Sequence, residues 1–260
     1  MFYPHLPLKH APMKRIFSLA AIVAVLSMPA QAVVILSEDF ETDGNGTRYT
    51  TSTLEFSDGG GDFFTRTDGT NIGGFINLQN VTGSWFAASD IDGEGADRRQ
   101  TLTFSGIPIA GFDSFRLSMD VAEDDDGTNQ DWDADDLVHA SFSIDGVPPS
   151  DFASGYAIWF DNDGATNTAP LLNPDFDADG DGPEVTDTFT TFSRDLGFST
   201  GSTADLVITF DLNSGDEDFH VDNIVFEGFV TAVPEPSSMV ALGSLAIGGI
   251  VSRRRRSKKA

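Results

Sequence analysis

The sequence predicts an all-β fold, a β-sandwich or jelly roll, and three observations support this prediction. Between residues 33 and 231, short segments alternate apolar and polar side chains with the two-residue period of a strand. Clusters of glycine and aspartate separate these segments, and no amphipathic helix pattern occurs in this range. The 22 phenylalanines supply apolar material for one sizeable core, and a body of about 200 residues suits a single large all-β domain.

The predicted strands are short and distributed along the whole body. The segment 33–36 opens it with β-branched residues. In the segment 137–144, Val138, Ala140 and Phe142 share one face, and an Asp-Gly turn follows. Around a dozen short strands of this kind are typical of a sandwich or jelly roll. The remaining predicted strands are 50–56, 63–67, 74–78, 85–89, 101–104, 112–121, 156–160, 189–196, 206–212 and 219–226.

The N-terminal segment predicts export. A Met-Lys-Arg start at 13–15 precedes an apolar stretch, 16–28, and a small-x-small sequence, Ala-Gln-Ala, at 30–32. This is the pattern of a secretory signal peptide, so residues 1–32 are expected to form a cleavable signal helix handled by the Sec export machinery. Because a complete signal begins at Met13, translation is expected to start there; a long charged region at the N-terminus is the alternative.

The C-terminal segment, 232–260, combines a proline stop, an uncharged apolar run and a basic cluster. Proline interrupts regular structure, and positive charge stays on the cytoplasmic side of a membrane. The apolar run, 237–252, is shorter than the roughly 20 residues of a comfortable span. We therefore expect a short hydrophobic helix that inserts transiently, with an ordinary membrane anchor as the alternative. The residues that carry the pattern are Val233, Pro234, Glu235, Pro236, Arg253, Arg254, Arg255 and Arg256.

This tail resembles the PEP-CTERM sorting signal of Gram-negative bacteria. The resemblance implies recognition by a membrane-embedded exosortase and removal of the tail. It also implies delivery of the body to the cell surface or to an extracellular matrix.

The body between the two targeting segments is strongly acidic. It contains six arginines, no lysine and 40 acidic residues, which gives a formal net charge of −34. Such a surface repels nucleic acid and anionic lipid, so neither is expected as a partner. It also repels itself unless cations neutralise it, and calcium prefers carboxylate oxygens. The chain has no cysteine, so metal ions are the expected substitute for disulfides in an exported protein.

One acidic loop has the spacing of a calcium-binding loop. Residues 175–180 fit the pattern D-x-D-x-D-G, in which three carboxylates curl around one hard cation and the glycine supplies a sharp turn. The twelfth position is Thr186 rather than a bidentate glutamate, so an open extracellular loop is expected and not an EF-hand. A solvated acidic turn is the alternative. The candidate ligands are Asp175, Asp177, Asp179 and Asp181.

A second acidic group surrounds the last predicted strand. Glu217 and Asp222 lie beside or within it, where a carboxylate is costly to bury unless it is paired or bound to metal. The opening and closing segments resemble those of secreted jelly-roll modules of the carbohydrate-binding or galactose-binding-like kind. The resemblance implies a structural calcium between the first and last strands, held by Asp39, Glu41 and Asp222. The body over 85–228 also resembles a widespread bacterial secreted domain, which supports the fold and calcium binding.

The segment 123–136 holds eight acids in fourteen residues. These like charges repel one another, so the loop is expected either to be disordered and solvated or to be held by cations.

The sequence gives little support for catalysis. The body has only two histidines, His139 and His220, no cysteine and no nucleophile-elbow motif, so no histidine-dependent hydrolysis is expected. His139 is expected on a solvent-facing or loop-covered face. A glycoside hydrolase needs only two suitably spaced carboxylates and remains a less favoured alternative. Among the tryptophans, Trp159 is expected in the core, and Trp132, which lies among aspartates, is the candidate for stacking on a sugar.

Together these features predict an exported, exosortase-sorted, calcium-stabilised β-sandwich of the cell surface or extracellular polysaccharide matrix. Its expected role is structural or adhesive rather than enzymatic. A carbohydrate-binding module is the main alternative.

Overall fold

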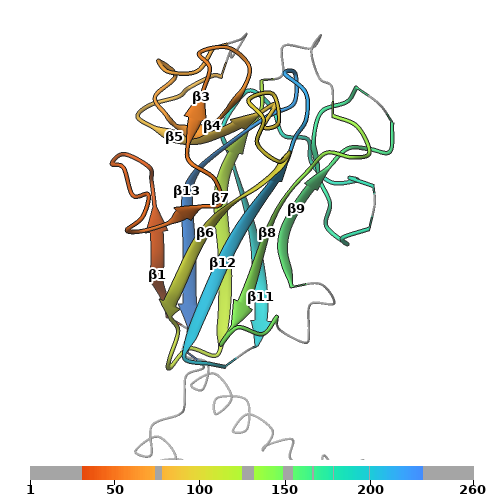
Figure 1. Cartoon of the computed structure of the whole chain (residues 1–260). Coiled ribbons are helices and arrows are strands. Elements are labelled where there is room, and N and C mark those ends of the chain that lie inside the picture. The colour runs from red at the N-terminus through yellow and green to blue at the C-terminus, as the bar shows by residue number, and fades with distance from the viewer. Residues whose placement is uncertain are drawn as a thin grey trace, which may run out of the picture. The chain divides into compact units, whose positions relative to one another are not determined.

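A computed structural model of the chain describes residues 31–73, 78–124, 132–148, 155–165, 167–177, 179–198 and 200–230. These residues form strands, turns and loops and no helix, which confirms the all-β prediction (Figure 1). Consistent with this, no described helix could cross a membrane. The predicted signal helix, the predicted C-terminal helix and most of the predicted strand 74–78 lie outside the described residues.

The strands assemble into two antiparallel sheets. In sheet 1 the order is β11-β7-β13-β5-β4-β3, and β1 also pairs with β13. In sheet 2 the order is β10-β9-β8-β12-β6-β2. The strands of sheet 1 are β1 (Ala32–Glu38), β3 (Phe56–Ser57), β4 (Phe63–Thr67), β5 (Trp85–Ser89), β7 (Ser114–Ala122), β11 (Thr190–Phe198) and β13 (Asp218–Phe229). Those of sheet 2 are β2 (Thr50–Thr51), β6 (Arg99–Pro108), β8 (Leu137–Ile144), β9 (Tyr156–Asp161), β10 (Leu171–Leu172) and β12 (Thr203–Asp211).

The last strand, β13, connects the parts of sheet 1. Along one edge it pairs with β7. Along the other edge its first residues pair with β5 and its later residues pair with β1. The first and last strands of the body therefore lie side by side, as the predicted site between them requires.

The core lies between the sheets and follows from strand alternation. In β7, for example, Phe115, Leu117 and Met119 are buried while the residues between them are partly exposed. Strand β5 is buried along its whole length, because a second, smaller apolar cluster around Trp85 covers its other face. Phenylalanine rings dominate the main core, where Phe64 and Phe86 pack edge to face with centroids 4.9 Å apart.

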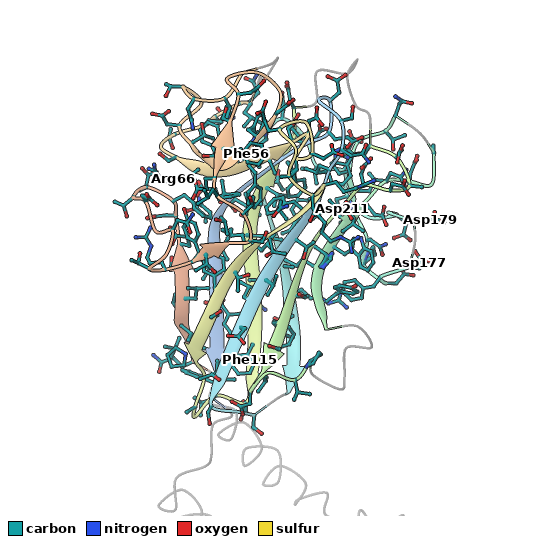
Figure 2. All side chains as sticks on the ribbon, in the orientation of Figure 1. Phe56, Arg66, Phe115, Asp177, Asp179 and Asp211 are labelled. Carbon is teal, nitrogen blue, oxygen red and sulfur yellow. The ribbon has the colours of Figure 1, made fainter. Side chains whose placement is uncertain are left out.

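The connections divide the sandwich into two unlike ends. The described residues of the connections 90–98, 123–136 and 212–217 lie at the end that is uppermost in Figure 1, and we call this end the acidic pole. The connection 162–189 begins there and returns along β9, so that Asp177 and Asp179 lie at the side of the sandwich (Figure 2). At the opposite end, Ala32 of β1 pairs with Phe229 of β13. Because antiparallel strands alternate direction, every second connection returns to the same end, and this topology gathers most acidic loops at one pole.

One predicted strand needs correction, and one short strand was not predicted. The predicted single strand 50–56 is two short strands, β2 in sheet 2 and β3 in sheet 1. The chain crosses between the sheets there, and Glu55 accepts a hydrogen bond from the backbone N–H of Arg66 at 2.9 Å. Strand β10 was not predicted, because a two-residue strand has no detectable alternation.

Candidate functional site

The structure places Asp39, Glu41 and Asp222 close enough for their charges to interact. Asp222 lies on β13 directly opposite Asp120 of β7. Burial, together with the charges of Asp120, Glu41 and Asp39, raises the pKa of Asp222 to about 7. Asn223 joins the two strands at this point, because its Nδ2 donates to Asp120 Oδ2 at 2.9 Å and to Asp222 Oδ2 at 3.3 Å.

Sequence reasoning missed Asp120 in this group. Asp120 could be found only from the pairing of β7 with β13, because Asp120 and Asp222 lie about a hundred residues apart in the sequence. A backbone irregularity between Asp222 and Val225, with Asn223 at φ +46°, turns this part of β13. We call Asp39, Glu41, Asp120 and Asp222 the terminal-strand group.

Arg66 on β4 fixes the segment that follows β1. Its guanidinium donates to the backbone carbonyls of Phe40 and Glu41 and, at 2.9 Å, to the hydroxyl of Ser84. The Glu41 carboxylate accepts the backbone N–H of Ser84 at 3.3 Å. Because the arginine uses backbone carbonyls, it does not neutralise the neighbouring acidic groups by direct ion pairs within 4 Å in the described structure.

The four predicted ligands in 175–181 are all exposed, and their carboxylates are not gathered around one point. Asp177 accepts the backbone N–H of Asp179 at 3.0 Å, which makes a local turn (Figure 2). The missed partner of this loop is Asp161 at the end of β9. Burial raises the pKa of Asp161 to about 6, and the charges of Asp179 and Asp177 add to the rise.

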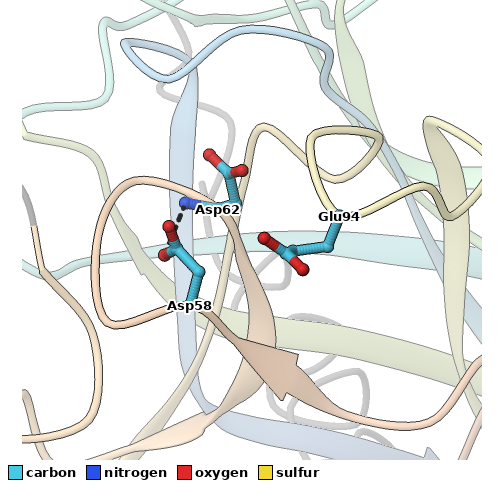
Figure 3. A group of neighbouring side chains, drawn as sticks. All are labelled: Asp58, Asp62 and Glu94. Carbon is cyan, nitrogen blue, oxygen red and sulfur yellow. Dashed lines mark hydrogen bonds between the residues drawn. The ribbon is translucent and has the colours of Figure 1, made fainter.

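A tighter acidic group lies at the acidic pole. Within the part of the chain that the structure describes, only Asp58, Asp62 and Glu94 have ligand oxygens that all lie within 4.8 Å of one another (Figure 3). Asp58 precedes β4 and Asp62 directly abuts it, while Glu94 comes from the turn after β5. Asp58 Oδ1 accepts the backbone N–H of Gly60 at 2.5 Å and that of Asp62 at 3.4 Å, which fixes the loop.

Two more carboxylates extend this group. Burial raises the pKa of Asp90 to about 7, and a hydrogen bond to Asp62 and the charges of Asp62 and Asp92 contribute as well. We call Asp58, Asp62, Asp90, Asp92 and Glu94 the β4–β5 acidic group. Its sequence signal was available, since 90–95 reads D-x-D-x-E-G, the same spacing as in 175–180 with glutamate at the fifth position. All ligand atoms are hard oxygens, so the group is suited to calcium rather than to a softer metal.

Glu217 lies in a different arrangement from the one expected. It is buried, and its Oε2 accepts the backbone N–H groups of Asn213 at 2.6 Å and Ser214 at 2.9 Å. Its side chain shares a hydrogen bond with Asp136, and burial raises the pKa of Asp136 to about 8 and also raises that of Glu217. Two carboxyl groups in contact share one proton, whereas a glycosidase pair is separated by about 5 to 10 Å.

Trp132 does not have the predicted position. Its side chain is 0% exposed, and its ring packs against Phe219 with centroids 5.9 Å apart. A fully buried ring cannot stack on a sugar, so this prediction is corrected. The acids around Trp132 suggested an exposed position. Asp136 instead turns inward, and its Oδ2 accepts the backbone N–H of Asp133 at 2.7 Å, which closes a turn next to Trp132.

Trp159 also differs from its prediction, since it lies half-buried on the outer face of sheet 2 and not in the core. Its ring centroid lies 4.6 Å from that of Tyr156 and 5.6 Å from that of His139. Phe176 joins them from the 175–181 loop, 6.4 Å from Trp159. We call these four rings the aromatic platform. His139 is on a covered outer face, as expected, and burial lowers its pKa to about 4, so it is neutral near pH 7.

A groove of about 460 Å³ lies beside the aromatic platform, between the edges of the two sheets. Its volume falls in the range of small-ligand pockets. Residues of β9, β11 and the segments around β10 line it. They include Ile158, Leu172, Pro174, Glu184, Thr191 and Arg194.

Comparisons with known proteins identify the tail and a general similarity of the body. A PEP-CTERM protein-sorting motif matches residues 232–256, so the chain is an exported protein that is sorted to the cell envelope. A search of curated proteins gave no match.

Among solved structures, the chain is similar to a CBM22-1 xylan-binding domain from Paenibacillus barcinonensis. The identity is 11%, with a TM-score of 0.39, over 79% of this chain and 100% of that domain. It is also similar to the K3 cleaved adhesin domain of Lys-gingipain from Porphyromonas gingivalis. There the identity is 14%, with a TM-score of 0.40, over 76% of this chain and 99% of that domain. These similarities are too distant to transfer a ligand, and the fold rests on the two sheets of the chain itself.

Proposed function

We propose that this chain is a calcium-stabilised β-sandwich with a structural or adhesive role at the cell surface or in the extracellular polysaccharide matrix of a Gram-negative bacterium. Exosortase would remove the tail after export by the Sec machinery. The body, 33–231, would act as one domain without a catalytic role.

The observation that supports calcium most strongly is the β4–β5 acidic group. Three of its carboxylates present oxygens within 4.8 Å of one another, and like charges at this distance repel unless a proton or a cation lies between them. Burial and its neighbours hold the pKa of Asp90 at about 7, so near neutral pH the group gains by exchanging a proton for a cation. The terminal-strand group is a looser place for a second ion between the first and last strands, because its charges interact although its oxygens do not all lie within 4.8 Å of one another. The predicted ligands in 175–181 would bind only after their exposed carboxylates converge.

Thermal unfolding of the full chain in mild detergent, with calcium or with a chelator, tests this proposal. An extracellular calcium site has a dissociation constant of about 10⁻⁴ to 10⁻³ M, so calcium at about 10 mM stabilises a protein by about 1.4–2.7 kcal/mol per site. For a body of this size the melting temperature then rises by about 3–10 °C per site. Equal melting temperatures in both buffers would refute calcium stabilisation.

Two variants test whether the calcium-dependent rise in melting temperature arises at the β4–β5 acidic group. Asp62→Asn should remove most of one site's calcium-dependent shift, because Asp62 contacts both Asp58 and Asp90. Asp195→Asn is the matched control, since it also removes one negative charge but lies in an exposed ion pair with Arg116 on β7. Exposed pairs contribute little, so this variant should keep the full shift.

Carbohydrate binding is the second candidate function, and the aromatic platform favours it. The half-buried rings of Tyr156 and Trp159 on the outer sheet face pack edge to face, with their planes at 68°, and present apolar ring surface outside the core. This would give the adhesive role a ligand in a polysaccharide matrix.

A further inference from the structure

We infer that the aromatic platform and the adjoining groove form a binding site for a neutral polysaccharide, with Trp159 and Tyr156 as its stacking residues. The inference rests on the adhesive role proposed above and names the class of ligand. This site takes the place of Trp132 as the candidate for stacking on a sugar, because Trp132 is buried in the core.

A β-bulge in β9 creates the platform. Ala140 of β8 pairs with Ile158, and the next residue, Ser141, pairs with Tyr156, so Ala157 is an extra residue in β9. In a regular strand, residues three apart point to opposite faces of the sheet. The bulge cancels this alternation and places Tyr156 and Trp159 on the same outer face, with ring centroids 4.6 Å apart.

Phe176 and Arg194 join the platform to the groove. The Phe176 ring lies 6.1 Å from Tyr156 and 6.4 Å from Trp159. The Arg194 guanidinium lies over Phe176, 4.1 Å from the ring centroid, and Nη1 donates to the backbone carbonyl of Pro174 at 3.1 Å. Since Arg194 and Pro174 also line the groove, the aromatic surface and the groove are continuous.

The surroundings select for a neutral ligand. The apolar C–H face of a pyranose ring packs on an aromatic face, and its hydroxyl groups need hydrogen-bond acceptors and donors at the rim. Exposed carboxylates of Asp175, Asp177 and Asp179 lie in the same loop as Phe176, and Glu184 and Thr191 lie in the groove. Carboxylates accept hydrogen bonds from hydroxyls but repel a uronic acid, so an acidic polysaccharide is disfavoured.

The tryptophans make this inference directly measurable. Trp132 is 0% exposed and Trp85 is 4% exposed, whereas Trp159 is only half-buried. A sugar that stacks on Trp159 therefore protects this one indole from acrylamide quenching. The probes are glucomannan, xylan and mixed-linkage β-glucan as neutral polysaccharides, and alginate as the acidic one.

The experiment uses the full chain in mild detergent with calcium present. Affinity electrophoresis and quenching should show binding to at least one neutral polysaccharide and weaker or no binding to alginate. Trp159→Ala should weaken binding about tenfold or more, since loss of a stacking face is worth about 1.4 kcal/mol. Trp159→Phe should bind with intermediate strength, which separates loss of stacking from loss of fold. The matched control, Leu54→Ala, removes a side chain that is 87% exposed and should bind as the unaltered chain does.

Two results would overturn the inference. One is that no neutral polysaccharide binds the folded chain. The other is that Trp159→Ala and Tyr156→Ala bind as strongly as the unaltered chain does. Both outcomes are independent of the calcium test. A chain that responds to calcium but binds no glycan would refute only the glycan site. A chain that binds glycan but is insensitive to chelator would refute only the calcium proposal.

Discussion

At the residue scale, the buried carboxylate of Glu38 holds the start of the sandwich together. Glu38 ends β1, is 1% exposed and accepts the backbone N–H of Phe40 at 2.9 Å. Arg48 donates to both carboxylate oxygens, at 2.6 Å from Nε and 2.9 Å from Nη2. A bidentate pair of this kind positions the loop after β1, which carries Asp39 and Glu41 of the terminal-strand group.

Removing only the arginine should be costly. We expect Arg48→Met to lower the free energy of unfolding by about 3 kcal/mol, because it leaves a buried charge without its partner. The double variant, Arg48→Met with Glu38→Gln, should recover most of this loss, since the amide stays neutral and can still accept the N–H of Phe40. Urea titration measures both. A double variant no more stable than the single one would contradict the explanation.

At the scale of elements, a glycine in the turn after β5 leaves room for a carboxylate of the β4–β5 acidic group. A Cβ at Gly93 would lie 2.2 Å from Asp62 Oδ2, so the carboxylate occupies the space that a side chain would take. The Asp62 carboxylate is the end of a short side chain and can move. A side chain at Gly93 should therefore displace the Asp62 carboxylate and leave the fold largely unchanged.

Gly93→Ala should accordingly reduce the calcium-dependent rise in melting temperature while changing the metal-free stability by only about 1 kcal/mol or less. Gly61→Ala is the matched control, because its added Cβ would meet only ordinary contacts at 3.7 Å with Gly215. Differential scanning calorimetry with and without calcium distinguishes them. Equal calcium responses in the two variants would show that Asp62 does not act in a metal site.

Strand alternation predicted most of the fold, because alternation is a local property. The predicted ranges 63–67, 85–89 and 137–144 coincide with β4, β5 and β8. The bulge at Ala157 could not be predicted, since it depends on the pairing of β9 with β8. That one extra residue brings Tyr156 to the outer face beside Trp159, which regular alternation already places opposite the buried Ile158 and Phe160.

The candidate sites divide in the same way. The D-x-D-x-E-G spacing at 90–95 is visible in the sequence, but Asp58 and Asp62 join it only through the fold. Asp120 likewise meets Asp222 only through strand pairing. Spacing therefore identifies loops with the right chemistry, while long-range pairing decides which carboxylates converge.

At the scale of the whole molecule, buried acids make stability depend on pH. Folding raises the pKa of Asp90 and Asp222 to about 7, of Asp136 to about 8 and of Asp161 to about 6. An acid with a raised pKa binds more protons in the folded state than in the unfolded state. Its contribution is therefore lost as the pH rises from its unfolded pKa, near 4, through its folded pKa.

The metal-free chain should therefore be more stable near about pH 5 than near about pH 8, unlike a protein dominated by ion-paired carboxylates. Calcium should reverse part of the loss, and its stabilising effect should be larger at the higher pH because protons compete with the cation for the same oxygens. Unfolding in urea at both pH values, with calcium and with chelator, measures this. A metal-free chain that gains stability on going to the higher pH would contradict it.

The pairing of Ala32 with Phe229 determines how mechanical force would pass through the molecule. Both ends of the body leave the sandwich opposite the acidic pole. A matrix polymer held at the aromatic platform and an attachment through the C-terminus would therefore load the sandwich along its strands. Pulling in this direction shears the hydrogen bonds of β13 with β7, β5 and β1 together, whereas a peeling force would break them one after another. An adhesive domain with this geometry should withstand tension better than one whose ends lie at opposite corners of a sheet.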